Sequence, residues 1–344
     1  MKVALVCPYD LGRWGGVQQQ VMELFRLLPV TGHEAVLIGP GAAAHGGVDV
    51  GRVVPIRANG SVVPLAVGAG IGKAIAKAVA AVDVVHVHEP LMPAVGWAAV
   101  RLGRKVVATF HARPPGWVKR LRWAIPSSWF RSTVLTAVST DAASLAESLS
   151  LGDVEIVPNG LHSRSYLTGQ ERDLQRVVFL GRDERRKGLS VLLAAWPRVR
   201  QAAPDAELIV VGADGRDDPT LGLAYAGRVG EDEKRSRLAS AGVMVAPNLG
   251  GESFGIVVAE AMAAGCAVVA SNLAAFSQLT AGAAMLVPPA DPAALAGALA
   301  ALLRDPAEIK RRSLAGIERA GEFDWSRVLP AYLRCYERAN ARPV

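Results

Sequence analysis

The sequence contains only three cysteines, Cys7, Cys266 and Cys335, and they are far apart. They show no metal-ligand spacing, so we expect free thiols in a reducing cytoplasm. No uninterrupted apolar stretch reaches the ~20 residues that a membrane-spanning helix needs. The opening run from Met1 to Cys7 has the length of a strand rather than of a signal core. We therefore expect a cytoplasmic protein that is soluble or peripheral on the inner face of the cell membrane.

Several motifs that would indicate other functions are also absent. The glycine-rich turn Gly12 to Gln18 is not G-x-G-x-x-G, which argues against a nicotinamide oxidoreductase. There is no Asp-x-Asp to hold a metal, so no essential metal is expected. The net charge of +7 alone would allow a nucleic acid, an anionic membrane or a phosphorylated substrate as partner. Because no recognition helix or stacking motif accompanies it, a nucleic-acid-binding protein is the least favoured of these.

The chain is long enough for two domains, with 344 residues of which 51% are hydrophobic. Short aliphatic runs alternate with helical patterns in both halves, which is typical of parallel, doubly wound α/β sheets. We expect one domain over 1–162, a second over 173–325, a polar linker from Gly160 to Gln175, and a C-terminal helix over 326–344 that crosses back to the first domain. The expected strands are Val3–Val6, Ala35–Ile38, Val84–Val87, Val106–Thr109, Leu135–Val138, Val177–Leu180, Leu208–Val211, Val243–Ala246, Ala267–Ala270 and Met285–Val287; the expected helices are Gly16–Leu28, Leu189–Arg200, Gly255–Ala264, Pro292–Leu303, Ala307–Ala320 and Trp325–Asn340.

The most informative motif is the run from Gly250 to Glu260. A Ser-Phe-Gly step opens the expected helix Gly255–Ala264, whose free N–H groups suit a diphosphate. Glu252 precedes the helix and Glu260 lies on it, so that one carboxylate can reach a ribose and the other a sugar beyond the phosphates. The spacing favours a sugar nucleotide, although an acidic turn that merely caps a helix stays open at this point.

Two further turns follow the first expected strand of each half. Gly15 and Gly16 let the backbone approach a phosphate at the start of a helix. Between Gly181 and Gly188 lie four basic residues, of which Arg182 and Lys187 can stabilise a departing diphosphate. The ordinary alternatives are a tight strand-to-helix turn and a solvated charged turn.

Two features of the first half are less specific. His111 ends an expected strand, where a lone histidine is more often packed or capped than functional. The segment Trp117 to Arg131 interleaves three tryptophans with basic residues, and no Asp or Glu occurs between Pro90 and Thr140. Such a segment suits an anionic bilayer surface, but a helix that covers the domain explains it equally well.

Together these motifs make the chain resemble the retaining glycosyltransferases of the GT-B fold, and among them the phosphatidylinositol mannosyltransferases of actinobacteria. The resemblance runs nearly end to end. The segments that carry it are 6–9, 15–18, 32–34, 59–61, 86–90, 108–111, 157–160, 187–188, 250–257 and 260–265, which include Val157-Pro158-Asn159-Gly160, Lys187-Gly188 and Glu260-Ala261-Met262-Ala263-Ala264-Gly265.

The resemblance implies two Rossmann-like domains that face a central cleft, a GDP-mannose donor, and a glycolipid or inositol-containing acceptor. It implies catalytic roles for His111, Arg182, Lys187 and Glu252. It places the donor on Gly15, Gly16, Arg182, Lys187, Val229, Glu231, Lys234, Phe254, Gly255, Ile256, Val257 and Glu260, with the ribose on Glu260, the transferred sugar on Glu252, and the base near Val229, Glu231 and Lys234. It places the acceptor on Tyr9, Gln18, Asn59 and Ser61.

Two departures concern the acceptor half. The phosphatidylinositol enzymes carry arginines for the lipid phosphate where this chain reads Val62-Val63-Pro64-Leu65-Ala66. After His111 the chain reads Ala112-Arg113-Pro114-Pro115-Gly116 in place of a hydroxyl-rich run. We expect a retaining hexosyltransferase that moves mannose from GDP-mannose to a lipid-linked inositol. The alternative is transfer to a soluble inositol phosphate or a secondary metabolite.

Overall fold

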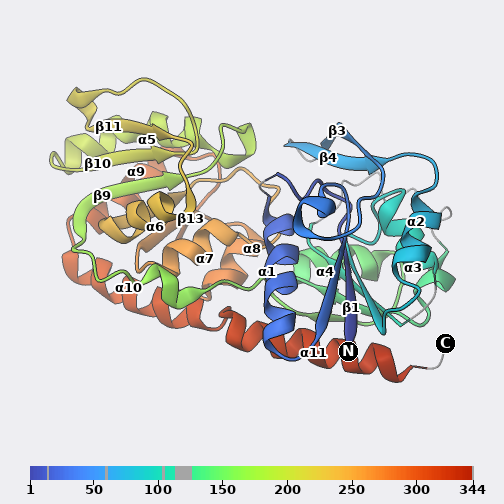
Figure 1. Cartoon of the computed structure of the whole chain (residues 1–344). Helices are drawn as coiled ribbons and strands as arrows, with labels where there is room; N and C mark the ends of the chain where they lie inside the picture. Colours follow the sequence, from blue (N-terminus) through green and yellow to red (C-terminus); the bar gives the residue numbers. More distant parts are fainter. Residues whose placement is uncertain (14, 59–60, 103–104, 113–125, 343–344) are drawn as a thin grey trace. The chain divides into compact units, whose positions relative to one another are not determined.

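A computed structural model describes the chain except at residues 14, 59–60, 103–104, 113–125 and 343–344. For 56–58 and 61–64 only the course of the backbone is considered. The chain forms two compact units: Met1–Gly160 together with Ser326–Val344, and Leu161–Trp325 (Figure 1). Each unit is described by itself below.

The first unit is built on a parallel six-stranded sheet in the order β2-β1-β5-β6-β7-β8. Its central strands are buried along their whole length, as expected where helices cover both faces of a parallel sheet. The elements are β1 (Lys2–Val6), α1 (Gly16–Val30), β2 (Glu34–Ile38), η1 (Ala42–His45), β3 (Arg52–Ala58), β4 (Ser61–Val67), α2 (Ile71–Ala78), β5 (Val84–His88), α3 (Val95–Arg101), β6 (Val106–Phe110), η3 (Ser127–Phe130), β7 (Val134–Ala137), α4 (Thr140–Ser148), β8 (Val154–Ile156) and α11 (Trp325–Ala341), the last of which belongs to this unit from Ser326 on.

The antiparallel hairpin β3–β4 was not expected from the sequence. Both strands contain a proline, and Pro55 lies directly opposite Pro64 in the register. Proline cannot donate to a strand ladder and usually argues against a strand, which is why the pattern concealed this pair. Both strands of this two-stranded hairpin are edge strands, where proline is tolerated.

The second unit holds a parallel six-stranded sheet in the order β11-β10-β9-β12-β13-β14. Counted within the unit, this is the 3-2-1-4-5-6 order of dinucleotide-binding domains, in which the order reverses between the first and fourth strands and ligands bind at the carboxyl ends there. The elements are η4 (Ser163–Tyr166), β9 (Asp173–Leu180), η5 (Arg185–Lys187), α5 (Leu189–Ala202), β10 (Glu207–Val211), η6 (Pro219–Leu221), β11 (Leu223–Gly227), α6 (Glu231–Ser240), β12 (Ala241–Ala246), α7 (Ile256–Ala263), β13 (Ala267–Ser271), α8 (Ala274–Thr280), β14 (Met285–Val287), α9 (Pro292–Leu303) and α10 (Pro306–Gly321).

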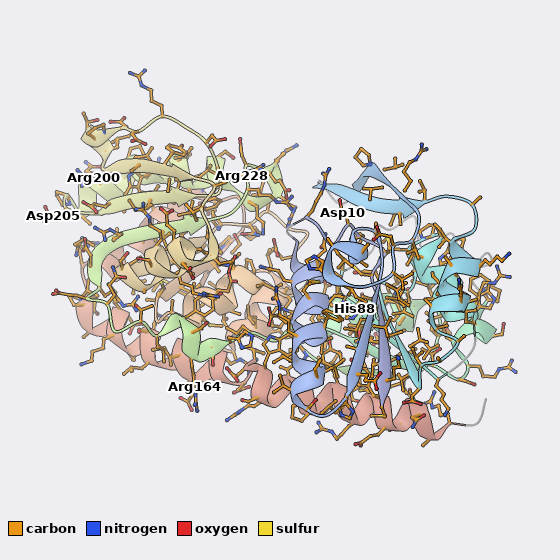
Figure 2. The ribbon with its side chains drawn as sticks, viewed as in Figure 1. Asp10, His88, Arg164, Arg200, Asp205 and Arg228 are labelled. Carbon is orange, nitrogen blue, oxygen red and sulfur yellow. The ribbon has the colours of Figure 1, made fainter. Side chains whose placement is uncertain are left out.

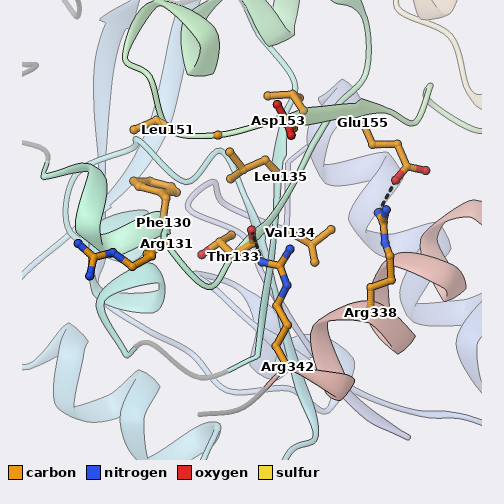
Figure 3. Close-up of a pocket in the computed structure, with 12 residues that line it drawn as sticks. Phe130, Arg131, Thr133, Val134, Leu135, Leu151, Asp153, Glu155, Arg338 and Arg342 are labelled. Carbon is orange, nitrogen blue, oxygen red and sulfur yellow. Dashed lines mark hydrogen bonds and ion pairs between the residues drawn. The ribbon is translucent and has the colours of Figure 1, made fainter.

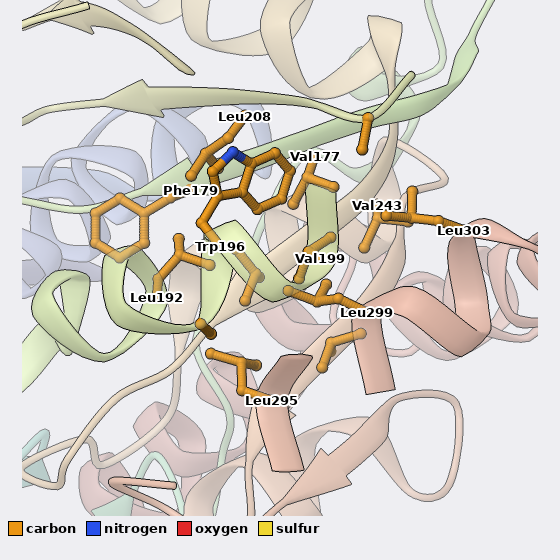
Figure 4. Packing of buried hydrophobic residues seen from close by; sticks show 14 of the residues in the cluster. Val177, Phe179, Leu192, Trp196, Val199, Leu208, Val243, Leu295, Leu299 and Leu303 are labelled. Carbon is orange, nitrogen blue, oxygen red and sulfur yellow. The ribbon is translucent and has the colours of Figure 1, made fainter. Parts of the chain in front are cut away.

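One apolar core of this unit lies between the sheet and helices α5 and α9 (Figure 4). Its largest member is Trp196, which is 1% exposed and whose indole N–H donates to the Leu221 carbonyl at 2.7 Å. The satisfied N–H removes the cost of burying a polar atom with the ring. The core fixes β9 and β10, and therefore the loop that leaves β9.

The polar segment expected as a linker is more ordered than its composition suggested. It begins at the boundary between the units, but it contains η4 and runs into β9, which starts at Asp173. Tyr166 is buried, and the Arg172 side chain bonds the carbonyls of Ala241 and Ala264. Lack of periodicity therefore reflected short elements held by side-chain contacts rather than an open chain.

Candidate functional site

In the second unit, two loops leave neighbouring strands where the strand order reverses. The first follows β9 and contains the basic run, and the second follows β12 and leads into α7; β9 and β12 pair directly. Gly188 closes the first loop at φ 72°, and a Cβ there would lie 1.9 Å from the Pro247 carbonyl oxygen of the second. Only glycine allows this approach, which brings the two loops together.

The Glu252 carboxylate is the centre of the contacts between these loops. Its Oε1 accepts from Lys187 Nζ at 2.5 Å, from Arg186 at 2.7 Å and from Asn248 Nδ2 at 2.8 Å. The side chains of Lys187 and Glu252 are each only 12% exposed. The hydrogen bonds from two cations and an amide offset the cost of removing the Glu252 carboxylate from water. The cations are thus held in place before any ligand arrives.

Arg182 differs from Lys187 in its exposure. Its side chain is 56% exposed and pairs with Glu184 at 2.9 Å. Lys187, by contrast, is covered by the second loop. A cation in this setting has a fixed position and little water around it, which strengthens its interaction with an anion.

Glu260 lies one turn into α7, which begins at Ile256 rather than at the expected Gly255. The carboxylate is buried and its Oε1 accepts from Tyr166 Oη and from Lys234 Nζ, both at 2.8 Å. Lys234 also pairs with Glu231 at 2.9 Å. Burial lowers the pKa of Lys234, but Glu260 and Glu231 outweigh it and raise this pKa overall. The structure thus brings together three residues that the sequence proposed for the ribose and base.

The start of α7 has no side-chain cap from its N-cap residue. Gly255 caps the helix at φ 99° with no side-chain hydrogen bond, and the helix has no acid in its first turn. The first N–H groups of a helix have no acceptor within it. Ile256 and Val257 are half-buried, whereas Phe254 is buried edge-on against Phe323 and can contribute only its backbone. Val229, also half-buried, lies in the loop between β11 and α6.

In the first unit, the residues proposed for the acceptor lie after β1. Gly15 and Gly16 form the start of α1. The buried Gln18 turns its amide to the Asp10 carbonyl at 3.4 Å. Tyr9 bridges to Leu65 of β4, and burial, with Glu89 nearby, raises the pKa of its hydroxyl well above the usual value. Gln18 and Tyr9 therefore lie at one edge of the sheet.

His111 follows β6 at the same edge. It is 6% exposed, and its Nε2 lies 2.8 Å from Nδ1 of His88, the last residue of β5. Its backbone N–H donates to the carboxyl group of Glu89 at 3.1 Å. Burial lowers the pKa of His111 to about 4, so the imidazole is neutral at pH 7. Figure 2 shows His88 within this unit.

Some predicted residues cannot be placed. Asn59 lies outside the described residues, and so does most of the segment from Trp117 to Arg131. Ser61 begins β4. Of that segment's tryptophans, Trp129 is described: it packs edge-on against Trp97 and beneath the guanidinium of Arg101. The Trp129 ring therefore packs against other residues of the first unit.

A cavity of about 470 Å³ lies elsewhere in the first unit (Figure 3). It is lined by the starts of β7 and β8, with Arg338 paired to Glu155 and Arg342 donating to the Thr133 carbonyl. The amino ends of parallel strands lie opposite to their carboxyl ends, so this cavity is not part of the edge that carries His111. Among the residues that the structure describes, no group of three His, Cys, Asp or Glu side chains could hold a metal ion. Within the same residues, no helix has the length and apolar character to cross a bilayer.

Sequence reasoning missed several side chains that the structure places at these sites. Arg186 was part of the basic run but was not singled out, although it reaches Glu252. Tyr166 lay in the presumed linker. Local patterns do not mark most of these residues, because their partners are distant in the chain; Asn248 is the exception, since it lies four residues before Glu252. The remaining ones are Asn248, His88 and Glu89.

Two family models match the chain. The first, described as "Glycosyltransferase Family 4", matches residues 14–164, and the second, "Glycosyl transferases group 1", matches residues 175–305. The chain is 37% identical to the phosphatidyl-myo-inositol mannosyltransferase of Mycolicibacterium smegmatis over 100% of this chain and 95% of that one. The enzyme of that name from Propionibacterium freudenreichii is 35% identical over 99% and 96% of the two chains.

Solved structures agree on the fold. A glycosyltransferase from Rickettsia africae superposes with a TM-score of 0.76 at 17% identity and covers 99% of both chains. An Anabaena protein crystallised with UDP gives a TM-score of 0.75 at 16% identity, over 98% of this chain and 100% of that one. The expected architecture of two doubly wound α/β units is confirmed. From the full-length similarity and the two matching models, this chain belongs to the phosphatidyl-myo-inositol mannosyltransferase family of GT-B hexosyltransferases.

Proposed function

We propose that the chain transfers mannose from GDP-mannose, with retention of configuration, to a lipid-linked inositol of the phosphatidylinositol type. The observation that carries this proposal is the pair of preformed ionic clusters in the second unit, around Glu252 and around Glu260, on either side of the start of α7. An anion-binding helix start between two carboxylates matches the order sugar, diphosphate, ribose in a sugar nucleotide.

The donor residues divide the work as follows. The N–H groups at the start of α7, with Lys187 and Arg182, bind the diphosphate. Glu252 accepts from hydroxyls of the transferred sugar, and Glu260 accepts from the ribose next to a base held by Val229, Glu231 and Lys234. Gly15 and Gly16 are proposed as further backbone contacts of the diphosphate. We further propose that 1–162 forms the acceptor domain and 173–325 the donor domain.

The leaving diphosphate gains charge as the glycosidic bond breaks. Lys187 is positioned for that charge, because it is nearly dry and already held by Glu252. No side chain is assigned as a covalent nucleophile, so the acceptor hydroxyl attacks on the face that the diphosphate leaves, and a departing phosphate oxygen takes its proton. His111 would lie beside the reacting sugar, where a neutral imidazole can hydrogen-bond without adding charge.

A second acceptor class is favoured by one observation. The run Val62-Val63-Pro64-Leu65-Ala66 in β4 offers no cation to a lipid phosphate. A secondary-metabolite alcohol, which carries no phosphate, is therefore the favoured alternative acceptor, and a soluble inositol phosphate is the other alternative. Tyr9 and Gln18, with Ser61 and Asn59, are the residues proposed to contact the acceptor in either case.

The test begins with the donor. The enzyme is incubated with each common sugar nucleotide, and slow release of free sugar is measured; GDP-mannose should give the fastest hydrolysis. The preferred donor is then offered with vesicles that contain phosphatidylinositol, or with soluble inositol phosphate. Mannosylated lipid would support the proposal, and product only in the soluble arm would select the alternative. Preference for another sugar nucleotide would overturn the donor assignment.

A further inference from the structure

The strand end His88-Glu89 contacts His111 at two separate points. Nδ1 of His88 lies 2.8 Å from the ring Nε2 of His111, and the Glu89 carboxyl accepts the backbone N–H of His111 at 3.1 Å. Adjacent residues of one strand end thus hold both the ring and the backbone of a residue on the next strand, since β5 pairs β6. Glu89 adopts φ 54°, an uncommon conformation for a residue with a side chain.

The two imidazole rings meet edge to edge. Their centroids are 5.1 Å apart and their planes differ by 27°. With the facing nitrogens at 2.8 Å, this separation is that of nearly coplanar rings joined through their nitrogens rather than of rings stacked face to face. Burial lowers the pKa of both histidines, so each carries a single ring proton at pH 7. One of these two protons must lie between the rings.

Only two arrangements are then available. If His111 donates from Nε2, His88 must carry its proton on Nε2. That atom is buried and has no hydrogen-bond partner among the described residues. An orphaned buried N–H is costly, about 1–3 kcal/mol, and rarer than an unsatisfied acceptor. If His88 donates from Nδ1 instead, its Nε2 is a bare lone pair and His111 carries its proton on Nδ1.

The surroundings of His111 fit the second arrangement. Asn159 lies close enough for its amide to raise the pKa of His111 against the effect of burial. Its Oδ1 is buried and makes no well-aligned hydrogen bond in the described part of the chain. This oxygen is an acceptor, so it favours an N–H on the side of His111 that faces it.

We propose that His88 is a positioning residue: it donates Nδ1–H to Nε2 of His111 and so fixes the proton of His111 on Nδ1, while Glu89 holds the His111 backbone. No well-aligned hydrogen bond to Oδ1 of Asn159 holds this N–H, so His111 can present it as a neutral donor to a hydroxyl of the bound sugar or acceptor, and it cannot accept a proton through Nδ1. The role toward a sugar rests on the proposed function, whereas the tautomer does not.

The tautomer is read directly from the imidazole ¹⁵N shifts of the full-length, ligand-free protein at pH 7. The chain has six histidines. The imidazole signals that disappear in His111→Gln and in His88→Gln are assigned to His111 and His88. In the wild type, Nδ1 of His111 should be protonated and Nε2 unprotonated. His88→Leu should remove this preference. His88→Gln should keep it, because the amide can donate to Nε2.

Measurements of turnover distinguish a positioning role of His88 from a packing role. His88→Leu should lower kcat about tenfold or more while the KM for the donor changes little, and His88→Gln should recover most of the loss. Glu89→Gln, which keeps an acceptor for the His111 N–H, should be milder than Glu89→Ala. Equal losses for His88→Leu and His88→Gln would reduce His88 to a packing role and overturn the proposal.

The ¹⁵N spectra test the tautomer of His111 whether or not the protein transfers a sugar. A wild-type His111 protonated on Nε2, or an unchanged tautomer in His88→Leu, overturns the proposal even if sugar transfer is confirmed. Protonation of Nδ1 supports it even if no sugar nucleotide is turned over. Should His88→Leu fail to fold, the wild-type and His88→Gln spectra still decide.

Discussion

The two units share a parallel, doubly wound sheet but carry opposite chemistry at the carboxyl ends of their strands. In the second unit the polar side chains are charged and paired, as Lys187 is with Glu252 and Lys234 with Glu260. In the first unit, those that follow β5 and β6 are buried and neutral: burial lowers the pKa of His111 to about 4 and raises that of Glu89 to about 8. The same fold thus supports a fixed ionic site and a fixed neutral one, because the loops rather than the sheet set the chemistry.

We propose that the charged side chains of the second unit stabilise the negative charge of the leaving diphosphate. The substitution Lys187→Ala is the strongest test of this proposal. If Lys187 meets charge that grows as the diphosphate leaves, turnover should fall by roughly 10²–10³-fold. The fold should survive, because Arg186 and Asn248 still hold Glu252. The exposed Arg185 is the matched control, and Arg185→Ala should leave turnover near normal. Steady-state kinetics with the preferred donor measure both, and a normal rate for Lys187→Ala would remove the contrast between the units.

Within the second unit, the two ionic clusters are predicted to hold different parts of the donor. Glu260→Ala should weaken both the nucleoside diphosphate and the sugar nucleotide by about 10–100-fold, as for a lost hydrogen bond to a charged group. Glu252→Ala should weaken the sugar nucleotide alone. Calorimetry with both ligands measures the difference. Identical losses of affinity in the two variants would contradict separate roles for the two clusters.

The neutral edge of the first unit predicts an unusual pH dependence. Glu89 keeps its proton up to a pKa of about 8 in the folded chain, mainly because of burial, whereas an ordinary glutamate releases it near 4.5. The folded state therefore binds the proton more tightly, and this contribution to stability is complete below pH 4.5 and is lost as the pH rises to 8. The loss is about 1.4 kcal/mol per pH unit over that window.

Glu89→Gln isolates this contribution, because its amide cannot ionise but still accepts the His111 N–H. The free energy of unfolding should decline less between pH 4.5 and 8 in the variant than in the wild type, as measured by urea denaturation at several pH values. The buried groups near Glu89, Cys7 and Tyr9, stay neutral throughout, since burial raises the pKa of Cys7 to about 12 and that of Tyr9 well above 10. Parallel curves would mean that Glu89 is ionised in the folded chain.

The smallest expected effect concerns the basic segment Trp117 to Arg131 of the sequence. Charge reversal at Lys119, Arg120 and Arg122 should release the protein from anionic vesicles, at about 1 kcal/mol per basic residue. Donor binding should be unaffected. Liposome flotation at low and high salt measures docking, which salt should weaken. A wild type that does not float with anionic vesicles at low salt favours a soluble acceptor.

Local patterns in the sequence predicted the repeating architecture well and the irregular parts poorly. Apart from β9, which begins at Asp173, four residues before the expected Val177, the expected strands and the helices α9 to α11 were found to within a residue or two at each end, because apolar runs and Asp-Pro or Gly boundaries are local signals. The hairpin β3–β4, with its paired prolines, was missed. So were the short strands β8 and β11, which are only half-buried along much of their length and carry a weak signal.

The candidate site divides in the same way. Glu252, Glu260, Lys187 and His111 stood out as residue types at fixed spacings and through the family resemblance. Their partners did not: Tyr166 is 94 residues from Glu260, and His88 is 23 residues from His111. A contact across such separations depends on which strands become neighbours in the sheet, and no periodicity within one segment encodes that.

The amino-acid sequence by itself therefore determined the class of fold and the repetition of the α/β pattern in both halves, and it supplied the residues proposed to bind a sugar nucleotide, because these follow from local periodicity, glycine geometry and side-chain chemistry. Only the tertiary structure decided which of these residues are shielded from solvent, which are charged and which are neutral. Exposure and pKa depend on the packing of segments that are distant in the chain, as Lys187 beneath the loop after β12 and His111 between His88 and Glu89 both show.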